Sequence, residues 1–332
     1  MKAKKFLAAI ALALTATTFA ACTNSDNAID FSPYWNSHWN VSEKIDETLE
    51  YDVTFEKGTP MTNINYELDY TNGLYTTHLV EDPTKAGFYT YTTTLEITAV
   101  YTYKSEVKEL TDSVVSTVTF SMNDGFAPIK SEKWIVSHSP ANATVSRVTQ
   151  AYDEFHRHVL TDYTGEDAVC KVWDSKPNSD GTANEKLLSE ETFSGKSGKH
   201  SYIDNEQLLL ALRCISTSVD SAKVKVYSPF TDETQKIKLS FEDEDESMEV
   251  SYFDYTANPD ATEKVKKAFD YRSVTMKLSS SNPGATQTAY IATYDNPEMN
   301  TSRNVMLKLE TPLAYNLGTL VYSLKSINRI KQ

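Results

Sequence analysis

Apolar and polar residues alternate along most of the chain, which is the pattern of β-strands that bury one face. The first clear run is Thr48–Phe55, where every second residue is apolar. Ile64–Tyr70 and Leu74–Val80 continue the pattern on either side of Asn72-Gly73, a dipeptide that favours a two-residue hairpin turn. These three runs therefore predict one strand followed by a hairpin.

Similar runs recur to the end of the chain and predict further strands. They cover Phe88–Tyr103, Val114–Met122, Ala168–Trp173, Lys186–Phe193, Ala222–Tyr227, Gln235–Phe241, Met248–Tyr255, Ser273–Ser279, Gln287–Tyr294, Asn304–Leu309 and Leu317–Leu324. The connections are short, and short turns join antiparallel strands, whereas parallel pairs need long crossovers. No fixed-period repeat and no Pro/Gly linker interrupts 45–332. The pattern predicts a mainly β protein with one large curved antiparallel sheet, a β-clam or an open half-barrel.

Two segments predict helices, and a third stays open. Asp204–Ile215 is apolar on most sides and starts with Asp204 and Gln207 at the spacing of a capping box. Such a helix needs burial, so we expect it in or beside the concave face of the sheet. Its leucines then either line a site for an apolar ligand or form plain core: Leu208, Leu209 and Leu212. Ala261–Phe269 predicts a short charged helix, whereas 145–160 fits a helix or a strand.

The first 22 residues have a different pattern. A head with three lysines precedes an apolar run, Phe6–Leu14, which is too short to span a bilayer, and small residues lead up to Cys22. We interpret 1–21 as an export signal with a lipobox-like end, the alternative being an ordinary secretory signal. Residues 22–44 then form a tether, and acyl chains such as palmitate on Cys22 anchor the domain 45–332 to the outer face of a bacterial membrane.

Composition narrows the range of partners. The 332 residues carry a formal charge of −14. The leader holds three lysines and no acids, so the mature chain reaches about −17. A body this acidic repels phosphate backbones, so we expect no nucleic-acid partner. After Cys22, two cysteines remain, and outside the cytosol Cys170 and Cys214 either form a disulfide or stay as buried thiols.

No catalytic motif stands out in the sequence. Gly-x-Ser-x-Gly, His-Glu-x-x-His and Cys-x-x-Cys patterns are all missing. His156 and His158 would share a face on a strand, but no further ligand follows at a metal-site spacing. Glu242–Glu246 is acidic enough to attract calcium, yet it lacks the order of an EF-hand loop and is better interpreted as a charged hairpin tip. We expect no catalytic residue, no metal and no cofactor.

Several stretches follow one another in an order that points to a family. Glu47–Val53 fits the pattern G-E-x-L-x-Y-x-V, with Asp46 in place of the glycine. Asp204–Arg213 fits D-x-L-S-A-L-x-A-L-R, and Arg303–Leu309 with Leu317–Leu320 fits a closing hairpin that here lacks its proline. Together these stretches resemble a family of uncharacterised bacterial envelope proteins. The resemblance implies a clam-like sheet similar to that of the periplasmic lipoprotein carriers, and it implies no reaction.

These observations give three functional hypotheses. The first is a membrane-tethered, non-enzymatic binding protein that holds a lipid or another apolar small molecule in the concave face. The second is a surface glycan-binding protein or adhesin that uses its tryptophans as stacking platforms: Trp35, Trp39, Trp134 and Trp173. The two tryptophans of the tether can instead dock it on the domain. The third is a hydrolase whose catalytic residues are scattered along the chain.

Overall fold

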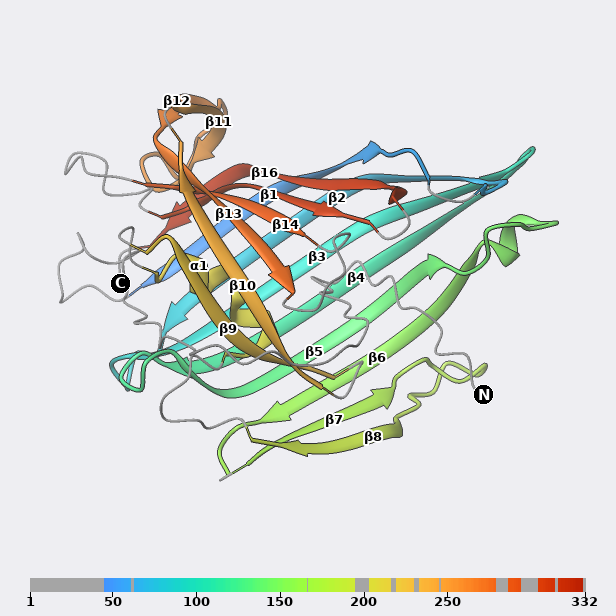
Figure 1. The fold of residues 1–332 in the computed structure, drawn as a ribbon, viewed down its shortest axis with the longest axis horizontal. Coiled ribbons are helices and arrows are strands. Elements are labelled where there is room, and N and C mark those ends of the chain that lie inside the picture. The colour runs from blue at the N-terminus through green and yellow to red at the C-terminus, as the bar shows by residue number, and fades with distance from the viewer. Residues whose placement is uncertain are drawn as a thin grey trace.

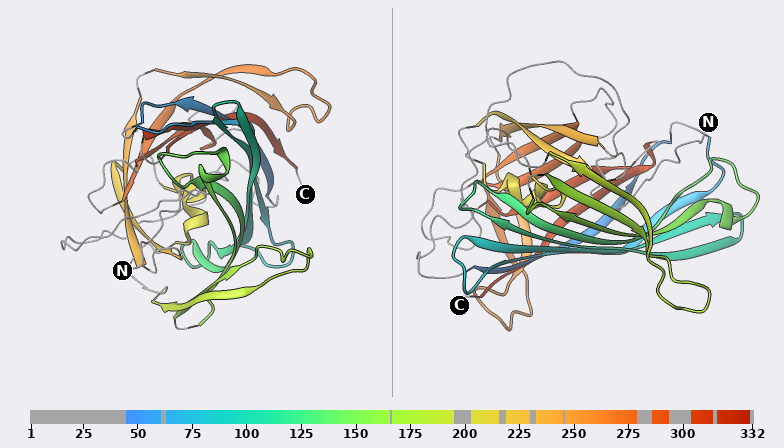
Figure 2. Two further views of the ribbon diagram at one scale, coloured as in Figure 1. Left: turned by 90° about the vertical axis from the view of Figure 1, so that its right-hand side faces the viewer. Right: turned by 90° about the horizontal axis from the view of Figure 1, so that it is seen from below.

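The protein forms one large β-sheet that curls around a short helix (Figure 1 and Figure 2). This computed structural model describes residues 45–60, 63–165, 167–194, 203–215, 219–229, 233–244, 246–278, 286–293, 304–313 and 316–330. The strands are β1 (Asp46–Lys57), β2 (Glu67–Glu81), β3 (Phe88–Tyr103), β4 (Glu106–Ser121), β5 (Ala127–Pro140), β6 (Tyr152–Asp162), β7 (Ala168–Asp174), β8 (Lys186–Phe193), β9 (Ser221–Ser228), β10 (Glu233–Asp243), β11 (Met248–Asp254), β12 (Val265–Phe269), β13 (Tyr271–Leu278), β14 (Gln287–Ala292), β15 (Met306–Pro312) and β16 (Gly318–Arg329). The helical segments are η2 (Val148–Gln150), η3 (Asn205–Gln207) and α1 (Leu208–Leu212).

The order of strands in the sheet follows the chain with one long-range closure. From β8 back to β1 the strands form an antiparallel meander, and β1 then pairs antiparallel with β16. The sheet continues through β15, β14, β13 and β10 to β9. A hairpin of β11 and β12 branches off, and β11 pairs in parallel with β16 at Phe253 and Asp254. The predicted fold class, a mainly β protein with one large curved antiparallel sheet, is confirmed.

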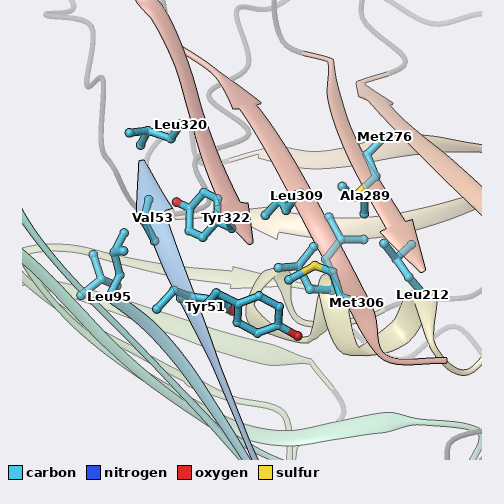
Figure 3. Close-up of a cluster of buried hydrophobic side chains, with 14 of the residues drawn as sticks. Tyr51, Val53, Leu95, Leu212, Met276, Ala289, Met306, Leu309, Leu320 and Tyr322 are labelled. Carbon is cyan, nitrogen blue, oxygen red and sulfur yellow. The ribbon is translucent and has the colours of Figure 1, made fainter. Parts of the chain in front are cut away.

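Alternation of residue types decides which face of the sheet is buried. In β3, for example, buried and more exposed positions alternate along all 16 residues. The inward side chains of the central strands and α1 form one core cluster. Figure 3 shows part of it, with Tyr51 and Val53 of β1, Tyr322 of β16 and Leu212 of α1 packed together. Each large apolar side chain buried in this way stabilises the fold by about 1.5–3 kcal/mol.

The two edge strands of the sheet approach each other on its inner side. Phe193 of β8 stacks on Tyr227 of β9, with ring centroids 3.9 Å apart and 8° between the ring planes. Tyr163 meets Phe193 edge-on at 6.1 Å. In the described chain no ladder of backbone hydrogen bonds joins β8 to β9. The sheet therefore comes close to a barrel whose seam is bridged by aromatic side chains (Figure 2).

The hairpin predicted at Asn72-Gly73 is wrong. β2 runs straight through this dipeptide, and its register with β3 shifts between Thr71 and Leu74, which marks a β-bulge. Asn72 supplies the left-handed backbone of the bulge with φ 53°. Gly73 is needed for close packing, since a Cβ there would lie 2.4 Å from the Val53 carbonyl oxygen. Positive φ serves a bulge as well as a turn, so the dipeptide alone does not distinguish them.

The helix predicted at Ala261–Phe269 is also wrong, because β12 occupies Val265–Phe269 and pairs with β11. Val265 and Phe269 are strand-favouring residues, and pairing with an existing strand outweighs the weak helical preference of the lysines between them. The open segment 145–160 divides into η2 and most of β6.

Candidate functional site

The helix begins with the predicted capping box and lies inside the curve of the sheet. The Asp204 carboxylate accepts a hydrogen bond from the Glu206 backbone N–H at 2.9 Å. The Gln207 side-chain oxygen in turn accepts one from the Asp204 N–H at 2.9 Å. η3 continues into α1, which ends at Leu212 rather than at Ile215. All five residues of α1 are buried, among them Leu208, Leu209 and Leu212, which belong to the packed core.

A buried ion cluster joins the end of α1 to β1 and β16, the strands that connect the two halves of the sheet. The Arg213 guanidinium donates to both Glu47 carboxylate oxygens, at 2.6 and 3.1 Å, and Arg329 Nε donates to Glu47 Oε2 at 2.6 Å. All three side chains are buried. Burial alone would raise the pKa of Glu47, but the two guanidiniums outweigh it and lower that pKa to about 2. The cluster fixes α1 against β1 and β16.

The concave face carries a polar band. Thr77, Thr93, Ser116 and Lys133 occupy paired positions on β2, β3, β4 and β5, and each side chain is buried. Thr93 Oγ1 lies 2.7 Å from Ser116 Oγ, and Lys133 Nζ donates to Glu206 Oε1 at 2.7 Å. The polar band can form hydrogen bonds with the polar residues at the start of the helix, as Lys133 does with Glu206. An acyl chain offers no hydrogen-bond partner to buried polar groups, so the band would be a poor lining for one.

Asp204 also attaches the start of the helix to the sheet. Ser131 Oγ and the Tyr163 hydroxyl both donate to Asp204 Oδ2, at 2.6 and 2.5 Å. Burial, followed by the neighbouring Glu206 carboxylate, raises the pKa of Asp204. Because the serine hydroxyl donates to a carboxylate that is already the helix cap, the geometry supports a structural role for this cluster.

Another buried acid, Asp112, lies where the ladder between β4 and β5 ends, at the pair Ser113 and Val136. Just beyond it, Asp112 Oδ1 accepts a hydrogen bond from the His138 backbone N–H at 2.8 Å and lies 2.7 Å from His138 Nδ1. The Tyr101 hydroxyl donates to the His138 carbonyl at 2.8 Å. Burial raises the pKa of Asp112. Where β4 and β5 separate, the Asp112 carboxylate thus accepts the hydrogen bond of the His138 N–H in place of a backbone carbonyl.

The outer face carries a row of mostly apolar side chains, partly or fully exposed, that crosses five strands. Its members occupy paired positions: Val115 on β4, Trp134 on β5, His158 on β6, Trp173 on β7 and Leu187 on β8. Val115, Trp134 and Leu187 are 40%, 42% and 47% exposed. We call this set the aromatic row. Contiguous apolar side chains on an outer face are typical of binding surfaces.

The rings at the centre of the aromatic row hold one another in place. The His158 ring stacks on Trp134, with centroids 3.8 Å apart and 6° between planes, and on Trp173, at 4.9 Å and 23°. His158 Nε2 lies 3.0 Å from Glu132 Oε1. The two indoles are therefore held in fixed positions before any ligand arrives, which lowers the entropic cost of binding.

Charged side chains flank the aromatic row in pairs of opposite sign. The pairs are Lys130–Glu132 at 3.9 Å, Lys171–Glu190 at 3.4 Å and Lys176–Glu154 at 2.6 Å. Their charges cancel, although the whole chain carries −14. His156 shares the outer face with His158, as a strand requires, but it contacts a different carboxylate, Glu154, at 2.9 Å. Among the described residues, no group of three or more His, Cys, Asp or Glu side chains is placed to hold a metal ion.

The two cysteines of the domain are thiols and are not joined in a disulfide. Cys170 lies in a small cluster between β6, β7 and β9, whereas Cys214 lies in the main core. Cys214 Sγ donates to the Leu210 carbonyl at 3.2 Å, and burial raises its pKa well above the usual range. Of the two alternatives that the sequence leaves open, the structure has the buried thiols.

Several predicted features lie outside the described residues. They are the export signal, the lipidation site Cys22, and the tether tryptophans Trp35 and Trp39. Across the part of the chain that the structure describes, no helix combines the length and the apolar character needed to cross a bilayer.

Comparisons with known proteins add little to this geometry. No family model and no curated protein matches the sequence. A solved structure with a similar course of the chain is a beta-barrel-like protein of domain of unknown function DUF1849 from Brucella abortus. The two chains share 10% identity and superpose with a TM-score of 0.46, over 86% of this chain and 98% of that one. The resemblance to a family of envelope proteins therefore stays a prediction.

Sequence reasoning did not find the aromatic row as a unit. Trp134 and Trp173 were candidates, but their alignment with His158, Val115 and Leu187 depends on the register of four strand pairs. The signal available in the sequence was weak: each residue occupies an outward position of its strand, where an apolar side chain is unexpected in a half-buried sheet.

Proposed function

We propose that the protein is a membrane-tethered, non-enzymatic binding protein that binds its ligand with the outer face of its sheet. Export and attachment through Cys22 rest on the leader and the polar tether that follows it. The observation that supports the binding surface is the aromatic row, which exposes Trp134 at 42% and Leu187 at 47%. Of the three hypotheses, the tryptophan platform has the strongest support.

The concave face gives less support to a site for an apolar ligand. The leucines of the helix are packed in the core, and the polar band beside it is hydrogen-bonded. An acyl chain at the position of α1 would have to displace a helix that the Glu47 ion cluster and the Asp204 cap hold at both ends. Breaking a buried ion pair costs about 3–5 kcal/mol, which an apolar ligand would have to offset.

A hydrolase has less support as well. Two of the buried acids, Asp204 and Asp112, are already used as a helix cap and as a substitute for a main-chain acceptor. The other two, Glu47 and Glu206, form ion pairs with Arg213 and Lys133. Neither arrangement has the chain of nucleophile, base and orienting group on which acyl transfer depends.

Sedimentation with cell envelopes tests the proposal. Envelopes prepared from the producing bacterium are mixed with purified residues 23–332, which lack both the apolar leader and Cys22, so that attachment has to come from the domain. We expect the protein to sediment with the envelopes and a double variant, Trp134→Ala with Trp173→Ala, to stay in solution. Val265→Ala is the matched control, because Val265 on β12 is exposed to a similar extent, 44%, away from the aromatic row.

Two results would contradict the proposal. One is that the double variant sediments as well as the unchanged protein. The other is a stoichiometric lipid in an organic extract of protein purified without detergent, which would move the binding site to the concave face. For the anchor, incorporation of labelled palmitate is expected in the unchanged chain and not in Cys22→Ser.

A further inference from the structure

We propose that the ligand of the aromatic row is an uncharged carbohydrate chain that lies across strands β4 to β8. This inference rests on the proposed function and adds the chemical class of the ligand. Four spacings between neighbouring strands make the aromatic row about 19 Å long. The site is therefore long and narrow, and its shape matches a linear chain of several sugar units better than a compact small molecule.

The composition of the aromatic row and its continuation fits the two surfaces of a sugar. A pyranose ring has faces of C–H groups and edges of hydroxyl groups. The C–H faces would pack on the exposed apolar surface of the aromatic row, which consists of the part of Trp134 that His158 leaves uncovered together with Val115 and Leu187. In the register of the sheet, the row continues from Val115 to Thr94 on β3 and Thr76 on β2. Apolar faces would meet aromatic rings at one end, and hydroxyl groups would meet threonine hydroxyls at the other.

The charges beside the aromatic row complement an uncharged ligand. The lysines and glutamates there form the three pairs described above, so that they offer hydrogen-bond donors and acceptors without net charge. Elsewhere the chain is strongly acidic. An anionic polymer would gain no attraction at the row and would be repelled by the rest of the molecule, and a cationic one would prefer other parts of the surface.

The fixed geometry of the rings supports the same class of ligand. Contacts between sugars and aromatic rings are individually weak, so they need rings that lose little freedom on binding. The stack of Trp134, His158 and Trp173 provides this, because each ring is held by its neighbour at 3.8 or 4.9 Å.

Affinity electrophoresis in native gels tests the inference. The gels contain laminarin, xylan, mannan, amylose or, as the charged comparison, alginate, and the protein is again residues 23–332. We expect at least one of the four uncharged polymers to slow migration and alginate not to do so. Trp134→Ala and Trp173→Ala are each expected to weaken binding by about 10-fold, whereas Trp134→Phe, which keeps a ring, retains more of it than Trp134→Ala.

Control variants separate the failure of this inference from that of the proposed function. Val265→Ala should migrate like the unchanged protein, and thermal unfolding checks that every variant is folded. If none of the four uncharged polymers slows the protein, or if alginate alone does, the inference is overturned. In that case, envelope binding that still depends on Trp134 and Trp173 leaves the proposed function standing with a ligand of another class.

Discussion

Replacing Glu47 with glutamine removes the only carboxylate that contacts both Arg213 and Arg329 in the described ion cluster, while keeping the size of the side chain. Glutamine leaves two buried guanidiniums without their carboxylate. We expect Glu47→Gln to destabilise the protein strongly at neutral pH and much less in acid, because the carboxylate itself becomes neutral there.

The pKa of Glu47 sets the size of this effect. It falls from an ordinary value of 4.5 to about 2 in the folded protein. A shift of this size corresponds to about 3 kcal/mol of stability, since one pKa unit is worth about 1.4 kcal/mol. Because the folded pKa is the lower one, this stability is fully present above pH 4.5 and is lost as the pH falls towards 2. At pH 3, about 1 kcal/mol of it would remain.

Urea unfolding of the unchanged protein and of Glu47→Gln at pH 7, 4 and 3 measures the effect. The difference in unfolding free energy is expected to be about 3 kcal/mol at pH 7 and to shrink steadily below pH 4.5. Glu56→Gln, an exposed change on the same strand, is the control and should stay within about 0.5 kcal/mol at every pH. A Glu47→Gln difference that is as large at pH 3 as at pH 7 would refute the electrostatic explanation.

Three further predictions concern the buried polar groups. Asp204→Ala is expected to lower the free energy of unfolding in urea by about 2–4 kcal/mol, because it removes the helix cap and the carboxylate that accepts hydrogen bonds from two buried hydroxyl groups. A decrease below about 1 kcal/mol would contradict the assigned role. Burial raises the pKa of Tyr66 and also of Tyr91 to about 12, so the folded state keeps protons that unfolded tyrosines lose near pH 10, and stability should fall as the pH rises above 10. The part of the absorbance rise at 295 nm that comes from these two tyrosines should then accompany unfolding rather than precede it. Ellman's reagent should react with Cys170 and Cys214 only after urea is added, and rapid reaction of the folded protein would show that these thiols are accessible.

The periodic parts of the fold could be predicted from the sequence. Strands such as β1, β3 and β7 match their predicted runs closely, because alternation reports directly which face is buried. The capping box was also predictable, since Asp204 and Gln207 act within one turn of helix. Both features depend on residues near each other in the chain.

Features that depend on which strands become neighbours could not be predicted. Asn72-Gly73 has the same local preference in a turn and in a bulge, and only the pairing of β3 with β2 on both sides of the dipeptide selects the bulge. In the same way, Val265–Phe269 forms a strand because it pairs with β11, although the two lysines of this segment are also compatible with a helix. Predicting the aromatic row would require the registers of four pairs of neighbouring strands. Predicting the Glu47 cluster would require its contact with Arg329, which is 282 residues away in the sequence.

The pairing of β1 with β16 has a consequence for how the chain acquires its structure. The meander from β1 to β8 contains mostly local contacts and can form early, but β1 must wait for the last strand of the chain before its second edge is covered. Contacts of such large sequence separation slow folding, and an open strand edge promotes aggregation in the meantime. Export with the N-terminus first, as proposed above, would hold this edge open throughout the passage of the chain. Loss of a few C-terminal residues from β16 should therefore harm the yield of folded protein more than an equal loss from any loop between strands.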